Sequence, residues 1–194
     1  MILPIVQYGH PTLRQKGARV EKITPEIAEL IRDMFETMYD ANGVGLAAQQ
    51  VAQAVQITVL DVREAKDRPS TLELDGKPAD VATFMPLVLI NPEITPVGEP
   101  ALAGEGCLSF PEIFADITRP SVVDVSAMTE RGEQIQFRAG GLLGRAVQHE
   151  TDHLHGILFI DRMSSATKQD LKPELEVLQA ETKVALAKAA RKTR

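Results

Sequence analysis

Apolar residues with helical spacing predict the first helix of this chain, beginning at Thr24-Pro25. Thr24 suits the N-cap, because its hydroxyl can accept a hydrogen bond from the first turn, and Pro25 suits the first helical position. The apolar positions that follow lie on one helix face and are Ile27, Leu30, Ile31, Met34, Phe35 and Met38. Asn42-Gly43 then indicates the end of this helix.

Strand-like patterns occupy the middle of the chain. Residues 56–62 and 121–127 alternate in the manner of half-buried strands. Residues 130–132 predict a turn into a further strand at 134–137. Residues 87–91 form a short apolar run, and we predict a strand that ends where Pro92 closes the run.

Two helices are predicted in the last third of the chain. Gly140-Gly141 breaks the strand pattern, and a helix follows whose apolar side consists of Leu142, Leu143, Ala146 and Val147. Gly156 indicates its end. Residues 168–194 read as one long helix that carries several leucines on one face.

Strands that come in a block, rather than in alternation with helices, favour the α+β class. We therefore predict antiparallel or mixed sheets packed around the central helix after Gly141, with a further helix at the C-terminus. One domain is expected over residues 1–165, with residues 166–194 as its helical extension. Residues 63–83 are polar and rich in turn residues, so a surface loop or an extended hairpin is expected there.

Composition and charge narrow the class of protein. The chain has 194 residues, of which 44% are hydrophobic and 25% charged, as in an ordinary globular protein. Its net charge of −6 argues against nonspecific nucleic-acid binding, so no DNA partner is expected. The single cysteine excludes an internal disulfide. No apolar run of about 18 residues is present, and the N-terminus does not resemble a secretory signal. A cytoplasmic location without membrane contact is expected.

The segment 148–154, which reads Gln-His-Glu-Thr-Asp-His-Leu, carries the most chemistry. On a helix, His149 and His153 lie on one face, one turn apart. Two imidazoles in this arrangement can bind one metal ion, and Glu150 between them can transfer a proton beside it. The alternative is a polar helix face with incidental histidines.

Cys107 offers the third ligand of such a site. A catalytic zinc-type site needs three protein ligands and one open position for water, and Cys107 with the two histidines meets that number. A closed structural site needs a fourth ligand, but the chain has no second cysteine, and His155 should point away from the metal face. The alternative for Cys107 is a small buried side chain, which its polar, glycine-containing surroundings disfavour.

A glycine-containing segment follows the first predicted helix. Residues 43–50 read Gly-Val-Gly-Leu-Ala-Ala-Gln-Gln. Gly43 and Gly45 allow close approach of the backbone to a ligand. Taken alone, the segment is more typical of an ordinary glycine turn that leads into a packing segment of small residues.

Together these segments resemble the peptide deformylase family. Its marks are a Gly-x-Gly-x-Ala-Ala-x-Gln segment, a Glu-Gly-Cys-Leu-Ser segment and a Gln-His-Glu-x-Asp-His-Leu segment, and all three are present here in that order. The resemblance extends over residues 5–163. It implies a metal-dependent hydrolase that removes the formyl group from the N-formylmethionyl peptides of nascent proteins and releases formate. It also implies Fe²⁺ as the cofactor, with Zn²⁺, Ni²⁺ or Co²⁺ able to substitute.

The resemblance implies a role for each site residue. Cys107, His149 and His153 hold the metal, and Glu150 transfers the proton. The catalytic donors to the oxyanion are the Gln50 side-chain amide and the Leu108 backbone N–H. The implied substrate-binding residues are Val44, Gly45, Gly106, Leu142, Arg145 and Ala146.

Supporting residues and departures from the family follow from the same comparison. Gln148 and Glu105 are expected behind the metal ligands, with Glu105 paired to Arg119. Arg145 stands where some members carry an aliphatic residue, and its stem is expected to line a pocket while its head reaches water. Phe114 stands where some members carry arginine. Both departures concern substrate preference.

The C-terminal end is basic although the whole chain is acidic. After Glu181 the charged side chains are Lys183, Lys188, Arg191, Lys192 and Arg194. A solvated, frayed tail is one interpretation. The other is contact with an anionic partner, and by resemblance this partner is the ribosome.

Two other functions compete with a deformylase. A general metallopeptidase of the His-Glu-x-x-His type usually takes a third histidine or an acidic residue as ligand, so Cys107 argues against it. A noncatalytic deformylase-like domain that only holds metal is the other. The presence of Glu150 and Gln50 argues against that alternative.

Overall fold

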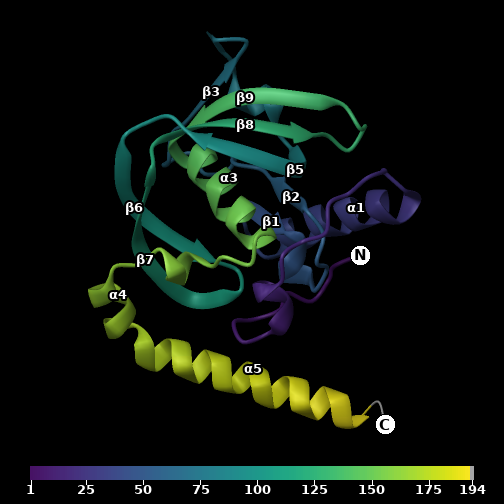
Figure 1. The fold of residues 1–194 in the computed structure, drawn as a ribbon, viewed down its shortest axis with the longest axis vertical. Helices are drawn as coiled ribbons and strands as arrows, with labels where there is room; N and C mark the ends of the chain where they lie inside the picture. The colour runs from purple at the N-terminus through teal and green to yellow at the C-terminus, as the bar shows by residue number, and fades with distance from the viewer. Residues whose placement is uncertain (193–194) are drawn as a thin grey trace.

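Two antiparallel sheets form the body of the chain in the computed structural model, which describes residues 1–192 (Figure 1). The larger sheet has seven strands, in the order β1-β2-β5-β8-β9-β3-β4. These strands are β1 (Gly45–Ala47), β2 (Ile57–Leu60), β3 (Ser70–Leu74), β4 (Lys77–Pro78), β5 (Leu87–Pro96), β8 (Val122–Met128) and β9 (Gln134–Gly140). The smaller sheet pairs β6 (Pro100–Cys107) with β7 (Phe110–Pro120).

Helix α3 (Gly141–Leu154) runs between the larger sheet and the β6–β7 pair (Figure 1). Its apolar side packs on the larger sheet through Leu143 and Val147, which are fully buried there. The other helices are α1 (Pro25–Asp40), α2 (Val81–Phe84), α4 (Ser165–Asp170) and α5 (Lys172–Lys192), with short 3₁₀ helices η1 (Pro11–Arg14), η2 (Ala48–Val51) and η3 (Phe159–Asp161). The predicted α+β fold around a central helix is confirmed.

Helix α1 begins and ends near the predicted positions. The Thr24 hydroxyl accepts a hydrogen bond from the Ile27 N–H at 3.4 Å, so Thr24 is the N-cap. Met34 and Met38 of the apolar stripe are fully buried against β1 and β2. Asn42 adopts a left-handed backbone with φ 54°, which stops the helix before the Gly43 segment.

The predicted strands are present, but the predicted end of one is wrong. Strand β5 continues through Pro92 to Pro96, with a shift in register between Ile90 and Glu93. Asn91 adopts φ 50°, and its side-chain amide bonds to both the N–H and the C=O of Val20 at 2.9 Å. Pro92 therefore lies at an irregularity, where its missing N–H breaks no ladder hydrogen bond, and the strand resumes beyond it.

The polar segment 63–83 forms the expected hairpin and also joins the larger sheet. Strands β3 and β4 pair around the Asp75-Gly76 turn, and β3 pairs with β9 on its other edge. The chain just before and within β3 also caps α3. The Pro69 carbonyl accepts a hydrogen bond from the Leu142 N–H at 2.9 Å, and the Ser70 hydroxyl accepts one from the Leu143 N–H at 3.0 Å. The N-cap of α3 is Gly140, which has no side chain to accept hydrogen bonds from the first N–H groups of the helix. Pro69 and Ser70 satisfy these donors instead.

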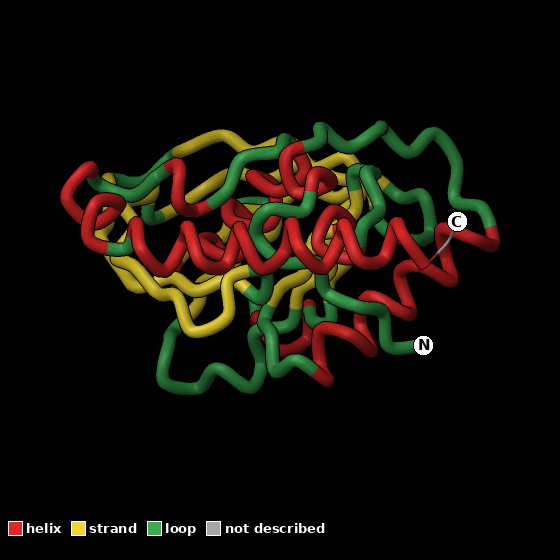
Figure 2. The backbone as a smooth tube through the Cα atoms, turned by 90° about the horizontal axis from the view of Figure 1, so that it is seen from below, coloured by secondary structure: helices red, strands yellow, loops and turns green. Residues whose placement is uncertain are grey.

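The C-terminal region consists of two helices and not of one. Helix α4 ends at Asp170, and α5 starts at Lys172 with Pro173 in its first turn, where proline lacks only an N–H that the helix does not use. Leu175 of α5 is buried against the core that contains Leu13 and Phe110. Figure 2, seen from below, shows α5 lying across the body of the molecule.

Arg194, the last residue of the predicted basic end, lies outside the described residues. The proposed division between residues 165 and 166 stays a prediction. None of the described helices combines the length and the apolar character that a membrane span requires.

Candidate metal centre

Cys107, His149 and His153 meet in space, as the sequence predicted. One possible ligand atom from each, the thiol sulfur or a ring nitrogen, lies within 4.8 Å of the others. Cys107 comes from the end of β6, and both histidines come from α3. Cys107 Sγ lies 3.3 Å from His153 Nε2, and the two imidazole rings lie 5.1 Å apart. His155 is exposed and bonds to the Thr151 carbonyl, so it lies outside the cluster as expected.

The cluster fits a divalent metal ion. His149 Nδ1 lies 3.0 Å from Glu105 Oε2, which directs the other ring nitrogen to the cluster, as is usual for metal-binding histidines. Burial lowers the pKa of His153, so its imidazole is neutral and has a lone pair to donate. Burial opposes a charge on His149 as well, but hydrogen bonds to Cys107 and Glu105 raise its pKa. One thiolate and two imidazoles form a donor set that suits first-row transition metals.

Glu150 lies beside the cluster with a free carboxylate oxygen. Its side chain is 5% exposed, and Oε2 has no hydrogen-bond partner among the described residues. Burial raises the pKa of Glu150 to about 7. Such a buried and unpaired acceptor is costly for stability alone, so its placement indicates a chemical role.

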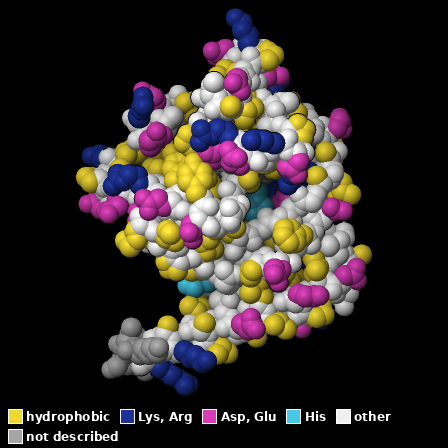
Figure 3. Space-filling view, turned by 180° about the vertical axis from the view of Figure 1, so that it is seen from behind, with side chains coloured by type: hydrophobic (Ala, Val, Ile, Leu, Met, Phe, Trp, Pro, Cys, Tyr) yellow, Lys and Arg dark blue, Asp and Glu magenta, His cyan; other side chains and the backbone are white. Residues whose placement is uncertain are grey.

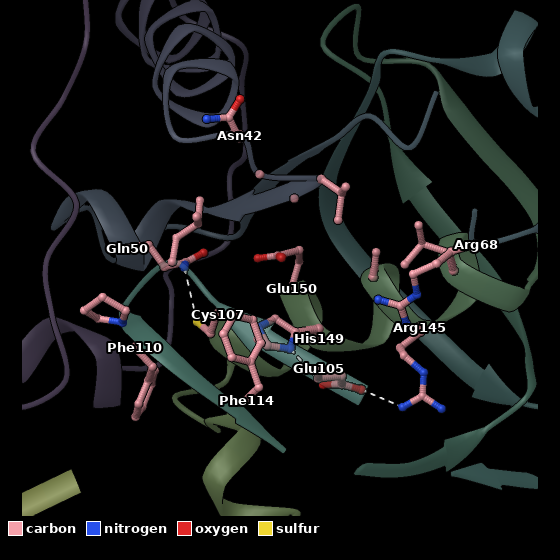
Figure 4. Close-up of a pocket in the computed structure, with 18 of the residues that line it drawn as sticks. Asn42, Gln50, Arg68, Glu105, Cys107, Phe110, Phe114, Arg145, His149 and Glu150 are labelled. Atoms are coloured by element: carbon pink, nitrogen blue, oxygen red, sulfur yellow. Dashed lines mark hydrogen bonds and ion pairs between the residues drawn. The ribbon is translucent and has the colours of Figure 1, made fainter. Parts of the chain in front are cut away.

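Gln50 approaches the cluster from η2. Its Oε1 accepts a hydrogen bond from the Ala47 N–H at 2.8 Å, which fixes the orientation of the amide. Its Nε2 donates toward Cys107 Sγ at 3.5 Å and Ser109 Oγ at 3.4 Å. The amide N–H₂ of Gln50 therefore faces the metal cluster (Figure 4).

A cavity of about 500 Å³, here called the metal pocket, opens onto the cluster. Cys107, His149 and Glu150 line it. All six predicted substrate-binding residues line it as well: Val44, Gly45, Gly106, Leu142, Arg145 and Ala146. Leu108 and Gln50 line it as well. Figure 3 shows histidine surface in the depth of a hollow on one face of the molecule.

Phe114 forms an exposed wall of this pocket. Its side chain is 71% exposed, and its ring lies 2.7 Å from where a Cβ would stand on Gly106. A side chain at position 106 would therefore push the exposed Phe114 ring away from this part of the strand. The Phe114 side chain presents an apolar surface to the pocket.

A buried network of charges supports the metal ligands. Arg119 Nε donates to Glu105 Oε1 at 2.6 Å, as predicted, and Arg119 Nη1 donates to Asp152 Oδ2 at 2.8 Å. Arg162 binds the same Asp152 carboxylate at 2.5 Å. Burial opposes the charge of Glu105, but hydrogen bonds from His149 and Arg119 hold its pKa well below the usual range. The anionic Glu105 therefore fixes the ring of His149.

Two sequence predictions about supporting residues are wrong. The Arg145 head does not reach water, because it donates to Glu105 Oε1 and to the carbonyls of Ile117 and Ala101, all at 2.8 Å. Gln148 does not support the ligands, because its side-chain N–H₂ donates to the Pro120 and Gly144 carbonyls. The strand pair β6–β7 provides most of these acceptors, and the sequence pattern did not reveal it.

Comparison with known proteins decides the family. A family model described as polypeptide deformylase matches residues 2–169. The chain belongs to the peptide deformylase family. It is 42% identical to the peptide deformylase of Opitutus terrae over 187 residues, which are 95% of this chain and 97% of that protein. The peptide deformylase of Methylacidiphilum infernorum is 44% identical over 179 residues, with 92% of this chain and 94% of that protein covered.

Solved structures agree with this family. The crystal structure of Arabidopsis thaliana peptide deformylase 1B matches with a TM-score of 0.79 and 34% identity, and the match covers 92% of this chain and 91% of that chain. As a peptide deformylase, the protein is an enzyme, a metal-binding hydrolase that acts in N-terminal processing.

Sequence reasoning missed two deformylase site residues that the structure brings in. Asp152 stands inside the Gln-His-Glu-x-Asp-His-Leu segment, so its position was a usable signal, and it proves to hold Arg119. Arg68 lines the metal pocket from the segment before β3. Nothing in its local sequence indicates a place near the metal ligands.

Proposed function

We propose that the enzyme hydrolyses the formyl group of N-formylmethionyl peptides with Cys107, His149 and His153 as metal ligands and Glu150 as the proton carrier. The observation that supports this assignment is the free Oε2 of buried Glu150 in the pocket that Cys107 and His149 line, next to the cluster that His153 completes. A carboxylate that is bound to no other residue can accept a proton from water and later release it.

The reaction adds water across one amide bond. A bound divalent ion would polarise the formyl carbonyl and lower the pKa of a nearby water molecule. As the water oxygen bonds to the formyl carbon, Glu150 accepts the proton that this oxygen loses. When the C–N bond breaks, Glu150 delivers the proton to the leaving amine, and formate and a free methionyl amine result.

The attacked carbonyl oxygen becomes negative, and two donors are proposed to stabilise it. Gln50 Nε2 already faces the cluster, because Ala47 holds the other side of its amide. The backbone N–H of Leu108, the residue after Cys107, is the second donor. Loss of one such donor typically costs about 2.7–4 kcal/mol in the barrier.

The metal pocket is proposed to bind the methionine side chain and the start of the peptide. Val44, Leu142 and Ala146 supply apolar walls. The aliphatic stem of Arg145 adds to them, because its guanidinium is held by Glu105. The backbones of Gly45 and Gly106 offer hydrogen bonds to the peptide. A site with these apolar walls and few polar groups is typical of small-ligand recognition.

We further propose Fe²⁺ as the physiological ion, with Zn²⁺, Ni²⁺ or Co²⁺ able to occupy the same ligands. The thiolate and imidazole donors are compatible with all four ions. The choice of iron among them rests on the resemblance to the family.

The basic end of α5 is proposed to contact the ribosome, and the enzyme is proposed to act in the cytoplasm. Lys183, Lys188 and Arg191 are exposed. In Figure 3, Lys and Arg side chains project from the molecule near the end of this helix. A cationic helix end favours contact with phosphate groups of RNA.

A formate-release assay tests the proposed activity. The purified, metal-loaded enzyme is given formyl-Met-Ala-Ser, acetyl-Met-Ala-Ser and casein. We expect formate from the first peptide, little reaction with the second and no cleavage of casein. Casein cleavage would favour a general metallopeptidase, and an enzyme that holds metal but releases no formate would favour a noncatalytic domain.

A further inference from the structure

Two unpaired strand edges border the metal pocket. Strand β1 is the last strand of the larger sheet, and among the strands of residues 1–192, β6 pairs with β7 alone. Gly45 of β1 and Gly106 of β6 both line the pocket. Unpaired strand edges present free N–H and C=O groups to an extended chain, so the geometry suits a peptide that lies as a strand between them.

Arg68 occupies the β6 edge two residues from Gly106. Its Nη2 donates to the Gly104 carbonyl at 3.1 Å. Residues two apart in a strand direct their backbone groups to the same edge, so Gly104 and Gly106 face the same side. The Arg68 head therefore lies about 7 Å beyond Gly106 along this edge, at roughly 3.3–3.4 Å per residue.

The backbone next to Arg68 is anchored on the metal-binding helix. Pro69 O and Ser70 Oγ accept hydrogen bonds from the first N–H groups of α3, at Leu142 and Leu143. These two bonds fix the backbone of residues 69–70, and so they also fix the position of the neighbouring Arg68. Figure 4 shows Arg68 and Gln50 on opposite sides of the pocket, with Glu150 between them.

The charge of Arg68 has no partner within the described part of the chain. No carboxylate of residues 1–192 lies within ion-pair distance of its guanidinium, and its hydrogen bond is to the neutral carbonyl of Gly104. Arg145 lies at the same end of the pocket, but its charge is paired with Glu105, which also forms an ion pair with Arg119. That end of the pocket therefore offers one free positive charge.

We propose that Arg68 is a specificity-determining residue that binds an acidic side chain on the third residue of the substrate peptide. This inference rests on the proposed function, which places the formyl group at the cluster beside Cys107. Methionine then lies opposite Gly106, and the third residue lies opposite Gly104. Alternate side chains of a strand point to the same face, so the third side chain shares the face of the methionine.

Peptides that differ only in the third residue test this subsite. The substrates are formyl-Met-Ala-Asp-Ser, formyl-Met-Ala-Asn-Ser and formyl-Met-Ala-Lys-Ser, all as C-terminal amides. We expect kcat/KM for the Asp peptide to exceed that for the Lys peptide by about three- to tenfold at low salt, in keeping with one solvent-exposed charge pair and its repulsive counterpart. The ratio should fall toward one in about 1 M NaCl, because salt screens exposed charges.

Variants of the same segment assign the preference to one side chain. Arg68→Gln should bring the Asp-to-Lys ratio to within about twofold of one, whereas Arg68→Lys should retain most of it. Lys66→Gln is the matched control, because it removes an exposed positive charge two residues away that does not line the pocket. It should leave the ratio unchanged.

The outcomes separate this subsite from the proposed function. The subsite would be overturned by equal kcat/KM for the Asp and Lys peptides in the wild type, or by an Arg68→Gln enzyme that keeps the wild-type Asp-to-Lys ratio. In either case, formate release from the Asn peptide would still uphold the proposed activity. If no formate is released from the Asn peptide by the metal-loaded enzyme, the proposed function itself fails.

Discussion

Glu150 Oε1 lies 2.5 Å from the position that a Cβ atom would take on Gly45. No side chain at position 45 is compatible with this arrangement. The glycine of β1 thus allows the carboxylate of α3 to lie against the backbone, beside the metal cluster and across the pocket from β6. The Gly-x-Gly segment and the His-Glu-x-x-His segment are therefore two halves of one site, although about a hundred residues separate them in the sequence.

Cys107→Ser should weaken metal binding, because a hydroxyl is a poor substitute for a thiolate. Metal analysis of the purified variant measures the effect. His155→Ala is the matched control, since this imidazole follows the same helix but lies outside the cluster, and it should retain full metal content. A Cys107→Ser protein with full metal occupancy would show that another residue supplies the third ligand.

Arg119→Ala should reduce the free energy of unfolding by about 1.5–3 kcal/mol, because it removes buried charged hydrogen bonds to Glu105 and Asp152, although each carboxylate keeps one other arginine. Urea denaturation of protein loaded with the same ion measures the loss. Arg138→Ala removes an arginine from an exposed pair with Asp124 and should cost less than about 1 kcal/mol. Similar losses for the two variants would contradict a supporting role for the buried network.

Truncation after Gln179 should leave hydrolysis of short formyl peptides unchanged and weaken binding to ribosomes. The part of α5 that packs on the body, including Leu175 and Leu178, is retained. A full-length variant with Lys183, Lys188 and Arg191 changed to Gln separates charge from helix length. Both proteins should bind ribosomes less tightly in a sedimentation assay at low salt, and the wild-type affinity should fall as salt rises. Undiminished binding by both would rule out docking through this helix.

The identity of the ion should determine both activity and stability in air. Protein from one preparation is stripped and reloaded with Fe²⁺, Zn²⁺ or Ni²⁺, and kcat/KM is measured on one formyl-Met peptide. We expect the Fe²⁺ form to exceed the Zn²⁺ form and to lose activity in air, because iron or Cys107 becomes oxidised. The Ni²⁺ form should stay active. Equal kcat/KM for iron and zinc, with no effect of air, would contradict iron as the physiological ion.

The metal ligands could be predicted from sequence because their signals are local or chemically distinctive. His149 and His153 are one helical turn apart, so their shared face follows from helix geometry alone. Cys107 is the only cysteine, and the three-ligand requirement of an open site selects it. Helix α1 could be predicted for a similar reason, because its N-cap and its apolar stripe lie in one continuous segment of the sequence.

Of the supporting network, only the Glu105–Arg119 pair was predicted, by resemblance; the other contacts could not be, because their partners come from distant segments. The acceptors of Arg145 are on β6 and β7, and the glycine-rich sequence of β6 has no strand pattern. Alternate residues of β6 are the more buried ones, but they are small or polar, whereas Leu102 is exposed, so the strand shows no apolar alternation in its sequence. Arg68 reaches the pocket only because β3 joins the sheet beside β9 and its first residues cap α3. Such contacts depend on tertiary structure and leave little trace in local sequence.

The measurement that tests the central assignment most directly is turnover by Glu150→Gln with its metal content determined on the same sample. The substitution keeps the size of the side chain and removes its ability to carry the proton, and Glu150 is not among the three ligands. We predict full metal content and a fall in kcat/KM of at least about 10²-fold on formyl-Met-Ala-Ser, the lower end for general acid–base catalysis. Near-normal turnover by a fully metal-loaded Glu150→Gln enzyme would contradict the role assigned to Glu150.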